Sequence, residues 1–354
     1  MQTVLFIILN SSYGGAEKHV YDLIENLDKD KYRISLIAAK NSKLSSMLKK
    51  RINIIEINTS LWNVGNLRKV ITQQNPDIIH IHSPRASFLS YISMAGKKKH
   101  KKILVTAHGW IPERFKFSKV FEFLYILSLR NVNKIIAVST QVKNLLIEKG
   151  VEHQKISVIP NGIELLQELP VVDCQINKPK FVFVGRFVEE KGLFYLLEAI
   201  KKLNNKYFNQ YSLDIYGSGP LENQILKFIN ENKLNNVKLK GFVQPEKVSE
   251  VLLLYDVFLL PSVQEGFPYT LIESLSRGLV VLGSDVGGIS EVLKDQFNGF
   301  LLTPKNSEDI YMKMEMIINM KKDDLTLMKT NAFNSSKPYN LKNMIESIDY
   351  LYNE

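Results

Sequence analysis

The sequence predicts an α/β protein made of two doubly wound domains. Its length is the first observation, because 354 residues exceed the roughly 100–200 that one domain usually holds. The second is an alternation of short apolar runs with segments of helical periodicity, which begins at the N-terminus, breaks once and begins again. Alternation of this kind predicts parallel sheets with helices on both faces.

The first apolar run, Thr3 to Leu9, is predicted to be a buried strand. It lacks the preceding positive charge and the following small-residue cleavage site of a signal peptide. A one-faced helix follows, because apolar residues recur at helical spacing: Val20, Leu23, Ile24 and Leu27. The other strands predicted in this half are 34–38, 52–57, 77–82, 103–107, 135–138 and 156–159.

The alternation breaks at 166–179, which contains Pro170 and Pro179, has no clear periodicity and is interpreted as a linker. Domains are therefore expected at 1–165 and 180–336. The second domain has predicted strands at 181–184, 213–216, 237–239, 257–260, 280–283 and 299–302, and its helices include 193–203 and 246–255. A last helix has one apolar face: Leu341, Met344, Ile345, Ile348 and Leu351. Ligands of such sheets bind beyond the carboxyl ends of the strands, so a cleft between the domains is the expected site.

The composition is that of an ordinary soluble protein, with 45% hydrophobic and 23% charged residues. No apolar stretch approaches the roughly 20 residues needed to cross a bilayer. Cys174 is the only cysteine, so an intrachain disulfide is excluded and a reducing compartment is expected. The predicted location is the cytoplasm, at most on the inner face of its membrane.

Positive charge is concentrated in the first half of the chain. There are 25 Lys and Arg against 13 Asp and Glu through residue 170, and 21 against 23 after it. The segments 96–102 and 114–123 are basic and interleaved with aromatic residues. They favour an anionic membrane that presents a lipid-linked acceptor. A solvated loop followed by a core helix explains them equally well, and nucleic acid is not expected because no binding fold accompanies the charge.

The segment Glu265 to Glu273 holds two carboxylates eight positions apart around a predicted helix start. Pro268 lacks a backbone N–H and has a fixed φ, so it is predicted in the first helical turn. This leaves Gly266 and Phe267 at the helix N-terminus, where unpaired N–H groups attract phosphate. The pattern suggests a nucleotide-sugar site.

Two further loops follow predicted strands of the second domain. After Gly185, Arg186 and Lys191 place two cations at the carboxyl edge of the sheet, where they can neutralise a diphosphate. Gly217 and Gly219 form a glycine loop before a helix, where the backbone can approach a ligand closely. The third glycine of the dinucleotide fingerprint is absent from this loop.

Other turns add weaker candidates. Gly14-Gly15-Ala16-Glu17 follows the first strand, and His108 follows another strand of the first domain. Gly287 and Gly288 form a turn that allows two loops to pack closely. Each candidate also has an ordinary structural explanation: tight turns for the glycines, and a structural role for a lone histidine.

The charged candidates have ordinary explanations too. Glu273 stands four positions before Arg277, the favoured orientation for a helical ion pair. Glu265 can be a solvated loop acid, and Arg186 and Lys191 two ordinary loop charges.

Together these segments resemble glycosyltransferase family 4, the retaining nucleotide-sugar enzymes of the GT-B fold. The resemblance rests on the motifs above and on His80-Ile81-His82, Thr106-Ala107-His108-Gly109 and Val158-Ile159-Pro160-Asn161-Gly162-Ile163. Glu164 departs from the aspartate that the family often has there. The resemblance implies two Rossmann-like domains, the first for the acceptor and the second for the donor, and a helix at 340–354 that crosses back onto the first domain.

The resemblance also implies roles for the site residues. Arg186 and Lys191 would hold the donor diphosphate, helped by Gly15 from the first domain and by the backbone N–H of Phe267. Glu273 would accept hydrogen bonds from the ribose, while Glu265 and His108 would contact the transferred sugar. The remaining donor-binding positions are the loop glycines Gly185, Gly217, Gly219 and Gly266. Side-chain cations make a metal unnecessary, so no metal site and no cofactor are expected.

The function implied is transfer of a hexose-type sugar from a UDP- or GDP-sugar to a saccharide acceptor, lipid-linked, in bacterial surface polysaccharide synthesis. Departure of the nucleoside diphosphate would be stabilised by cations and a helix dipole. Retention could arise by front-face attack or by double displacement through Glu265. A GT-B sugar-nucleotide epimerase and a non-catalytic sugar-nucleotide-binding subunit of a synthase complex remain alternatives.

Overall fold

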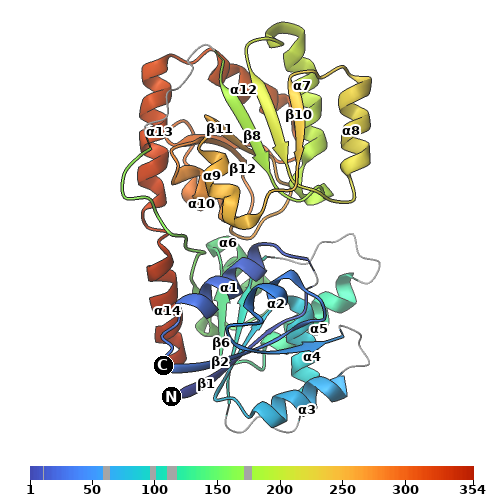
Figure 1. Ribbon diagram of the computed structural model, residues 1–354, viewed down its shortest axis with the longest axis vertical. Coiled ribbons are helices and arrows are strands. Elements are labelled where there is room, and N and C mark those ends of the chain that lie inside the picture. The colour runs from blue at the N-terminus through green and yellow to red at the C-terminus, as the bar shows by residue number, and fades with distance from the viewer. Residues whose placement is uncertain (11, 59–63, 96–100, 110–117, 171–177) are drawn as a thin grey trace. The chain divides into compact units, whose positions relative to one another are not determined.

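The computed structural model describes residues 1–354 except 11, 59–63, 96–100, 110–117 and 171–177 (Figure 1). The chain divides into two compact units. Unit 1 comprises Met1–Asn161 with Leu341–Glu354, and unit 2 comprises Gly162–Asn340. Much of the predicted linker, with Cys174, and parts of both basic segments lie outside the described residues.

Unit 1 is built on a parallel sheet with the strand order β3-β2-β1-β4-β5-β6-β7. The order starts at a central strand, runs to one edge and returns to the other, which is the doubly wound arrangement that the sequence predicts. The strands are β1 (Gln2–Ile8), β2 (Tyr32–Ala39), β3 (Asn53–Ile57), β4 (Ile78–His82), β5 (Lys102–Ala107), β6 (Lys134–Ala137) and β7 (Ile156–Val158).

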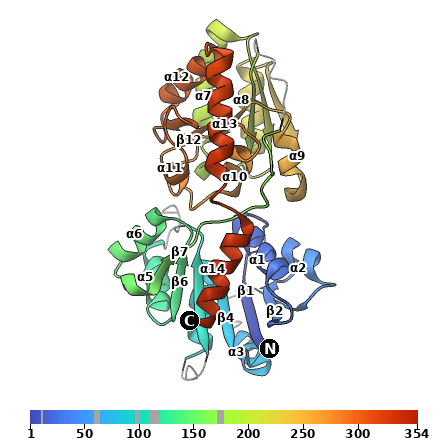
Figure 2. The same cartoon turned by 90° about the vertical axis from the view of Figure 1, so that its left-hand side faces the viewer.

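Helices cover this sheet, and the last of them comes from the C-terminus of the chain. They are α1 (Gly15–Asn26), α2 (Lys43–Leu48), α3 (Val64–Gln74), α4 (Pro84–Ser93), α5 (Ser118–Leu129), α6 (Thr140–Glu148) and α14 (Leu341–Asn353), with a 3-10 turn at His153–Lys155. Met344, Ile348 and Leu351 of α14 lie in one core with Val4 and Phe6 of β1. The apolar face of the C-terminal helix therefore packs on the first sheet (Figure 2).

Unit 2 repeats the architecture with the strand order β10-β9-β8-β11-β12-β13, all parallel. Its strands are β8 (Lys180–Val184), β9 (Ser212–Tyr216), β10 (Val237–Gly241), β11 (Val257–Leu260), β12 (Val280–Ser284) and β13 (Gly299–Leu302). Its helices are α7 (Leu193–Tyr207), α8 (Glu222–Glu231), α9 (Val248–Leu252), α10 (Tyr269–Leu275), α11 (Ile289–Val292), α12 (Ser307–Ile318) and α13 (Lys322–Ser336), with 3-10 turns at Glu189–Lys191 and Pro245–Lys247. The predicted doubly wound fold is confirmed in both units.

Two helix boundaries differ from the prediction. The helix expected at 246–255 is a 3-10 turn followed by the short α9. Pro268 caps α10 from outside, because its ψ of 129° is extended, and the first helical residue is Tyr269. A proline lacks the N–H that the cap position does not need, so it fits just before the helix as well as in its first turn. Placing Pro268 in the first turn was wrong by one residue.

None of the helices in the described ranges combines the length and the apolar character needed to span a bilayer.

Candidate functional site

Two loops at the carboxyl ends of β8 and β9 are hydrogen-bonded to each other. Gly185 N donates to Tyr216 O over 3.1 Å, and Phe187 N donates to Ser218 O over 2.9 Å. The contact is too close for a side chain at Gly217, since a Cβ there would lie 1.8 Å from Gly185 O. Packing between the loops thus accounts for this glycine, and a donor contact by Gly217 stays a prediction. At Gly219 a Cβ would lie 2.6 Å from Phe187 O. Loop packing therefore accounts for this glycine too, and its contact with the donor also stays a prediction.

Lys191 and Glu265 form an ion pair, 74 positions apart in sequence. Lys191 ends the 3-10 turn that precedes α7, and Val263 N donates to Glu190 O over 2.8 Å, which fixes this turn against the segment after β11. Lys191 Nζ lies 2.5 Å from Glu265 Oε1, and Ser262 Oγ donates to the same oxygen over 2.6 Å. The two side chains are 18% and 10% exposed, so the pair is accessible only in part. We call it the loop pair.

The backbone beneath the loop pair is held by a glycine turn. Gly287 has φ of 60°, and a Cβ there would lie 2.4 Å from Glu265 O. Gly288 N donates to Gly266 O over 2.6 Å. This is the close packing of two loops that the Gly287-Gly288 sequence predicts, and it determines where the Glu265 backbone lies.

The other predicted donor-site residues of unit 2 differ in exposure. Arg186 is exposed at the same sheet edge, directly after Gly185. The Phe267 side chain is buried, with its ring centroid 5.2 Å from that of Tyr339. Glu273 is only 6% exposed, in the middle of α10.

Glu273 interacts electrostatically with Arg277, its partner in the helical ion pair that the sequence offers as an alternative to ribose binding. Burial lowers the pKa of the Arg277 guanidinium, and the charge of Glu273 acts in the opposite direction. The charge of Glu273 thus acts on Arg277, and a contact of Glu273 with the ribose stays a prediction.

In unit 1, Gly15 begins α1 and lies beside a carboxylate that organises the turn. Glu17 is 4% exposed, and it accepts hydrogen bonds from Gly14 N over 2.8 Å and from Asn10 Nδ2 over 2.7 Å. The N-terminal turn of this helix is thus fixed by its own side chain. That geometry accounts for the Gly-Gly-Ala-Glu sequence without a ligand.

His108 belongs to a cluster of four histidines, which we call the histidine cluster: His19, His80, His82 and His108. Ring centroids are separated by 4.2 Å between His80 and His82, 5.4 Å between His82 and His108, and 4.9 Å between His19 and His108. His80 binds Tyr352 Oη of α14 through Nδ1 (2.7 Å) and Thr106 Oγ1 through Nε2 (2.8 Å). The C-terminal helix therefore contacts the cluster directly.

Burial keeps these four imidazoles neutral. It lowers the pKa of His19 to about 4, against 6.5 for a free side chain, while a hydrogen bond with Asn161 works in the opposite direction. Burial, with repulsion from the neighbouring imidazoles, holds the pKa of His80, His82 and His108 well below the usual range. Within the described ranges, no cluster of three or more His, Cys, Asp or Glu side chains is arranged to hold a metal ion.

The hydrogen bond between His82 and His108 indicates which nitrogen carries the proton in these two rings. His82 Nδ1 lies 3.1 Å from His108 Nε2, while His82 Nε2 is buried without a hydrogen-bond partner among the described residues. An orphaned buried N–H is rarer in proteins than a bare acceptor, so the His82 proton belongs on Nδ1. His82 then donates to His108 Nε2. This leaves the proton of His108 on Nδ1, which can then act as a donor.

The sequence analysis singled out His108, but it did not predict that the other three histidines surround it. The pattern His80-Ile81-His82 could have indicated part of it, because residues two apart in a strand share a face. His82 also pairs in register with Thr106, two positions before His108. His19 gave no such indication, since it meets the cluster from α1 through tertiary packing.

Comparison with solved structures defines the class of the fold. A crystal structure of HepE from Anabaena in complex with UDP-glucose superposes with a TM-score of 0.85 at 17% identity, over 100% of both chains. Two doubly wound units of this kind give the protein the GT-B fold.

Comparison of sequences gives the family. Residues 13–166 match Glycosyltransferase Family 4, and residues 173–334 match glycosyl transferases group 1. The chain therefore belongs to glycosyltransferase family 4, group 1, and is a glycosyltransferase. It is 27% identical over 370 aligned positions to an Escherichia coli UDP-Gal:alpha-D-GlcNAc-diphosphoundecaprenol alpha-1,3-galactosyltransferase, covering 96% of this chain and 93% of that protein. It is also 27% identical to a subunit of the human phosphatidylinositol N-acetylglucosaminyltransferase, covering 96% of this chain and 73% of that protein.

Proposed function

We propose that the protein transfers a hexose-type sugar from a UDP- or GDP-sugar to a saccharide acceptor, with retention of the anomeric configuration. The acceptor is lipid-linked, and the product enters a bacterial surface polysaccharide. The E. coli relative, which acts on a diphosphoundecaprenol-linked sugar, and the HepE complex with UDP-glucose support this substrate class.

The observation that carries the proposal is the loop pair. It places a cation and a carboxylate 2.5 Å apart at the carboxyl edge of a parallel sheet, where ligands of doubly wound folds bind. Both contacts of the carboxylate use Oε1, so Oε2 of Glu265 can accept hydrogen bonds from sugar hydroxyls. Lys191 and the exposed Arg186 next to the sheet edge stabilise the charge that develops on the departing diphosphate.

Unit 1 contributes His108 as a neutral hydrogen-bond donor. Burial holds its pKa well below the usual range, and with the inferred proton on Nδ1 it offers an N–H to a sugar hydroxyl without adding charge. We propose that the backbone N–H of Gly15, the first residue of α1, helps to bind the diphosphate. Glu273 binds the ribose.

The test is an assay of sugar transfer and donor hydrolysis with a panel of UDP- and GDP-sugars and an undecaprenyl-diphosphate saccharide. We expect turnover with one donor, and an anomeric configuration in the product, read by NMR, that equals that of the donor. Arg186→Ala should raise the donor KM, whereas Lys202→Ala, which breaks an exposed ion pair with Glu308, should not. An inverted product, or equal kinetics for both variants, would contradict the proposal.

We propose that neither a metal nor a cofactor is needed, since Arg186 and Lys191 supply the positive charge. Turnover should be unchanged by EDTA. Loss of activity in EDTA that is restored by Mg²⁺ or Mn²⁺ would show that the two side chains are insufficient.

We also propose that unit 1 associates with the inner face of an anionic membrane. On α5, Phe123 is 66% exposed and Val120 is 58% exposed, beside the exposed Lys119. Apolar side chains next to basic ones favour a membrane interface. Co-sedimentation should therefore be stronger with anionic than with neutral vesicles, and Phe123→Ser should weaken it. Equal pelleting in both would refute the association.

Neither an epimerase nor a non-catalytic subunit is favoured, because the matched families and the named relatives are transferases.

A further inference from the structure

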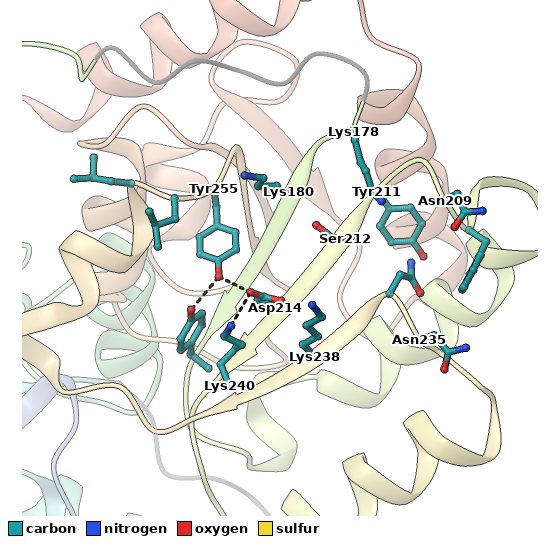
Figure 3. Close-up of a pocket in the computed structure, with 15 residues that line it drawn as sticks. Lys178, Lys180, Asn209, Tyr211, Ser212, Asp214, Asn235, Lys238, Lys240 and Tyr255 are labelled. Carbon is teal, nitrogen blue, oxygen red and sulfur yellow. Dashed lines mark hydrogen bonds and ion pairs between the residues drawn. The ribbon is translucent and has the colours of Figure 1, made fainter.

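One face of the unit 2 sheet carries a lysine-lined hollow. Its volume is about 710 Å³, and it lies over β8, β9 and β10 (Figure 3). Four lysines line it, and we call it the lysine pocket: Lys178, Lys180, Lys238 and Lys240. Parallel sheets normally bury both faces, so an open, polar face at this place requires an explanation.

Strand periodicity places these lysines on a common face. In β9, Leu213 and Ile215 belong to the core, so Ser212 and Asp214 face the other way into the hollow. In β10, Val237 is a core residue, and Lys238 and Lys240 alternate with it. The sequence therefore builds one apolar and one basic face from the same strands.

The register then fixes the neighbours across the strands. Lys180 of β8 pairs with Ser212 of β9, and Lys238 of β10 pairs with Asp214. Lysines from both sides of β9 thus border one area of the sheet (Figure 3).

Positive charge exceeds negative charge in this pocket. Among the described residues, Asp214 is the one acid that lines it, and Asp214 Oδ2 already accepts a hydrogen bond from Tyr255 Oη over 2.7 Å. Tyr255 Oη is in turn 3.0 Å from Tyr216 Oη, and Lys240 Nζ lies 3.6 Å from the same carboxylate (Figure 3). Lys178, Lys180 and Lys238 are all exposed. The excess is local, because the chain after residue 170 has 21 basic and 23 acidic residues.

Protection of a sheet edge explains only part of this arrangement. Lysines on an edge strand discourage pairing with other chains, and this accounts for Lys238 and Lys240 on β10. Lys180 lies on β8, two strands in from the edge, so it has no such role. A membrane surface is also a poor fit, because the lysines line a concave hollow rather than a flat or convex face.

We propose that the lysine pocket binds a small polyanion, a ligand with two or more phosphate groups. Its volume is in the range of about 300–1,000 Å³ of small-molecule sites, and its lysines can meet several anionic groups at once. This site is distinct from the loop pair: Lys180 and Ser212 begin their strands, whereas Gly185 and Gly217 follow the carboxyl ends of the same strands. The site therefore does not depend on the proposed donor chemistry.

The test is calorimetric titration of the full chain with tripolyphosphate, with and without saturating UDP. We expect a binding event that persists with UDP present and weakens as salt is raised. The double variant Lys180→Glu/Lys238→Glu should weaken it by at least about tenfold, because two attractive charges become repulsive. The matched control Lys201→Glu/Lys322→Glu makes the same charge change on exposed residues of α7 and α13 and should keep the affinity within about twofold.

Three results would overturn the proposal. One is an affinity that both double variants lower equally, which would indicate net charge rather than a site. Another is binding that disappears with UDP or with Lys191→Ala, which would assign it to the loop pair. The third is binding to vesicles of phosphatidylglycerol without binding to tripolyphosphate. Thermal unfolding of the variants verifies folding, which two exposed lysine substitutions should preserve.

Discussion

The histidine cluster of unit 1 and the loop pair of unit 2 position their polar side chains in different ways. His19, His80 and His82 are buried and His108 is half-buried, and lowered pKa values keep all four imidazoles neutral. The hydrogen bond between His82 and His108 decides where the protons of these two rings lie. The loop pair keeps opposite charges at a partly exposed edge, and its position follows from packed backbone. The cluster should therefore be sensitive to pH and to single hydrogen-bond changes, and the loop pair to loss of charge and to backbone displacement.

Removal of charge from the loop pair should have the largest effect. Glu265→Gln keeps the shape of the side chain but removes the charge, and we expect kcat to fall by about 10²–10³. UDP affinity should stay the same or rise, because Lys191 loses a competing anion. Lys191→Ala should lower both kcat and UDP affinity. Steady-state kinetics measures kcat, and calorimetry measures UDP affinity, for each variant. If Glu265→Gln and Lys191→Ala change both quantities alike, the two residues do not have separate roles.

Mild acid should destabilise unit 1 selectively. The pKa of His19 is 6.5 when unfolded and about 4 when folded, so the unfolded state binds more protons between these values. Stability that is present above pH 6.5 is therefore lost as the pH falls, by about 2 kcal/mol at pH 5 from this residue. His80, His82 and His108 act in the same direction.

Unit 2 provides the internal control, because all six histidines of the chain lie within residues 1–161. Hydrogen exchange at pH 7.5 and pH 5, corrected for intrinsic rates, should show lower protection of β4 at pH 5 and little change in β11. Equal losses in both units would rule out the histidines as the cause. His19→Leu should reduce the pH dependence of β4.

Displacement of the loop-pair backbone should have an intermediate effect. Gly287→Ala places a methyl group where a Cβ would be 2.4 Å from Glu265 O, at a φ of 60°. We expect a loss of about 2 kcal/mol in the free energy of unfolding and a lower kcat, since Glu265 must move. Gly241→Ala is the matched control, because Gly241 also has positive φ, of 72°, but no atom within 4 Å of its Cβ position. If both variants behave alike, backbone strain rather than contact with Glu265 is responsible.

The sequence predicts the sheets well because their signals are local. Period-2 and period-3.6 patterns and the glycines after strands all act within a few residues, and each predicted strand is present. The family resemblance also places Lys191 and Glu265 in one donor site. The contact between their side chains could not be predicted in this way, because it depends on how two distant segments pack. At Gly192 the backbone lies so close to Pro261 that a Cβ would be 1.9 Å from Pro261 O.

Tertiary packing accounts for what was missed. His19 reaches the cluster because α1 covers β4, and the lysine pocket exists because part of the second sheet remains open. The alternation of Val237, Lys238, Leu239 and Lys240 is visible in the sequence, but the sequence does not show that this face forms a hollow. The roles assigned to Arg186 and Glu273 remain predictions, since their positions fit both explanations.

The smallest effect should come from the hydrogen bond between His82 and His108. Nitrogen NMR of labelled imidazoles should show both rings neutral at pH 7.5, with the proton on Nδ1. His82→Leu removes the donor, and loss of one neutral hydrogen bond, worth about 1 kcal/mol, should lower kcat about fivefold. His82→Asn, whose amide N–H can take the place of Nδ1–H, should restore most of the activity. A His108 proton found on Nε2 would reverse the direction of this hydrogen bond, and His108 could then present only an acceptor to the sugar.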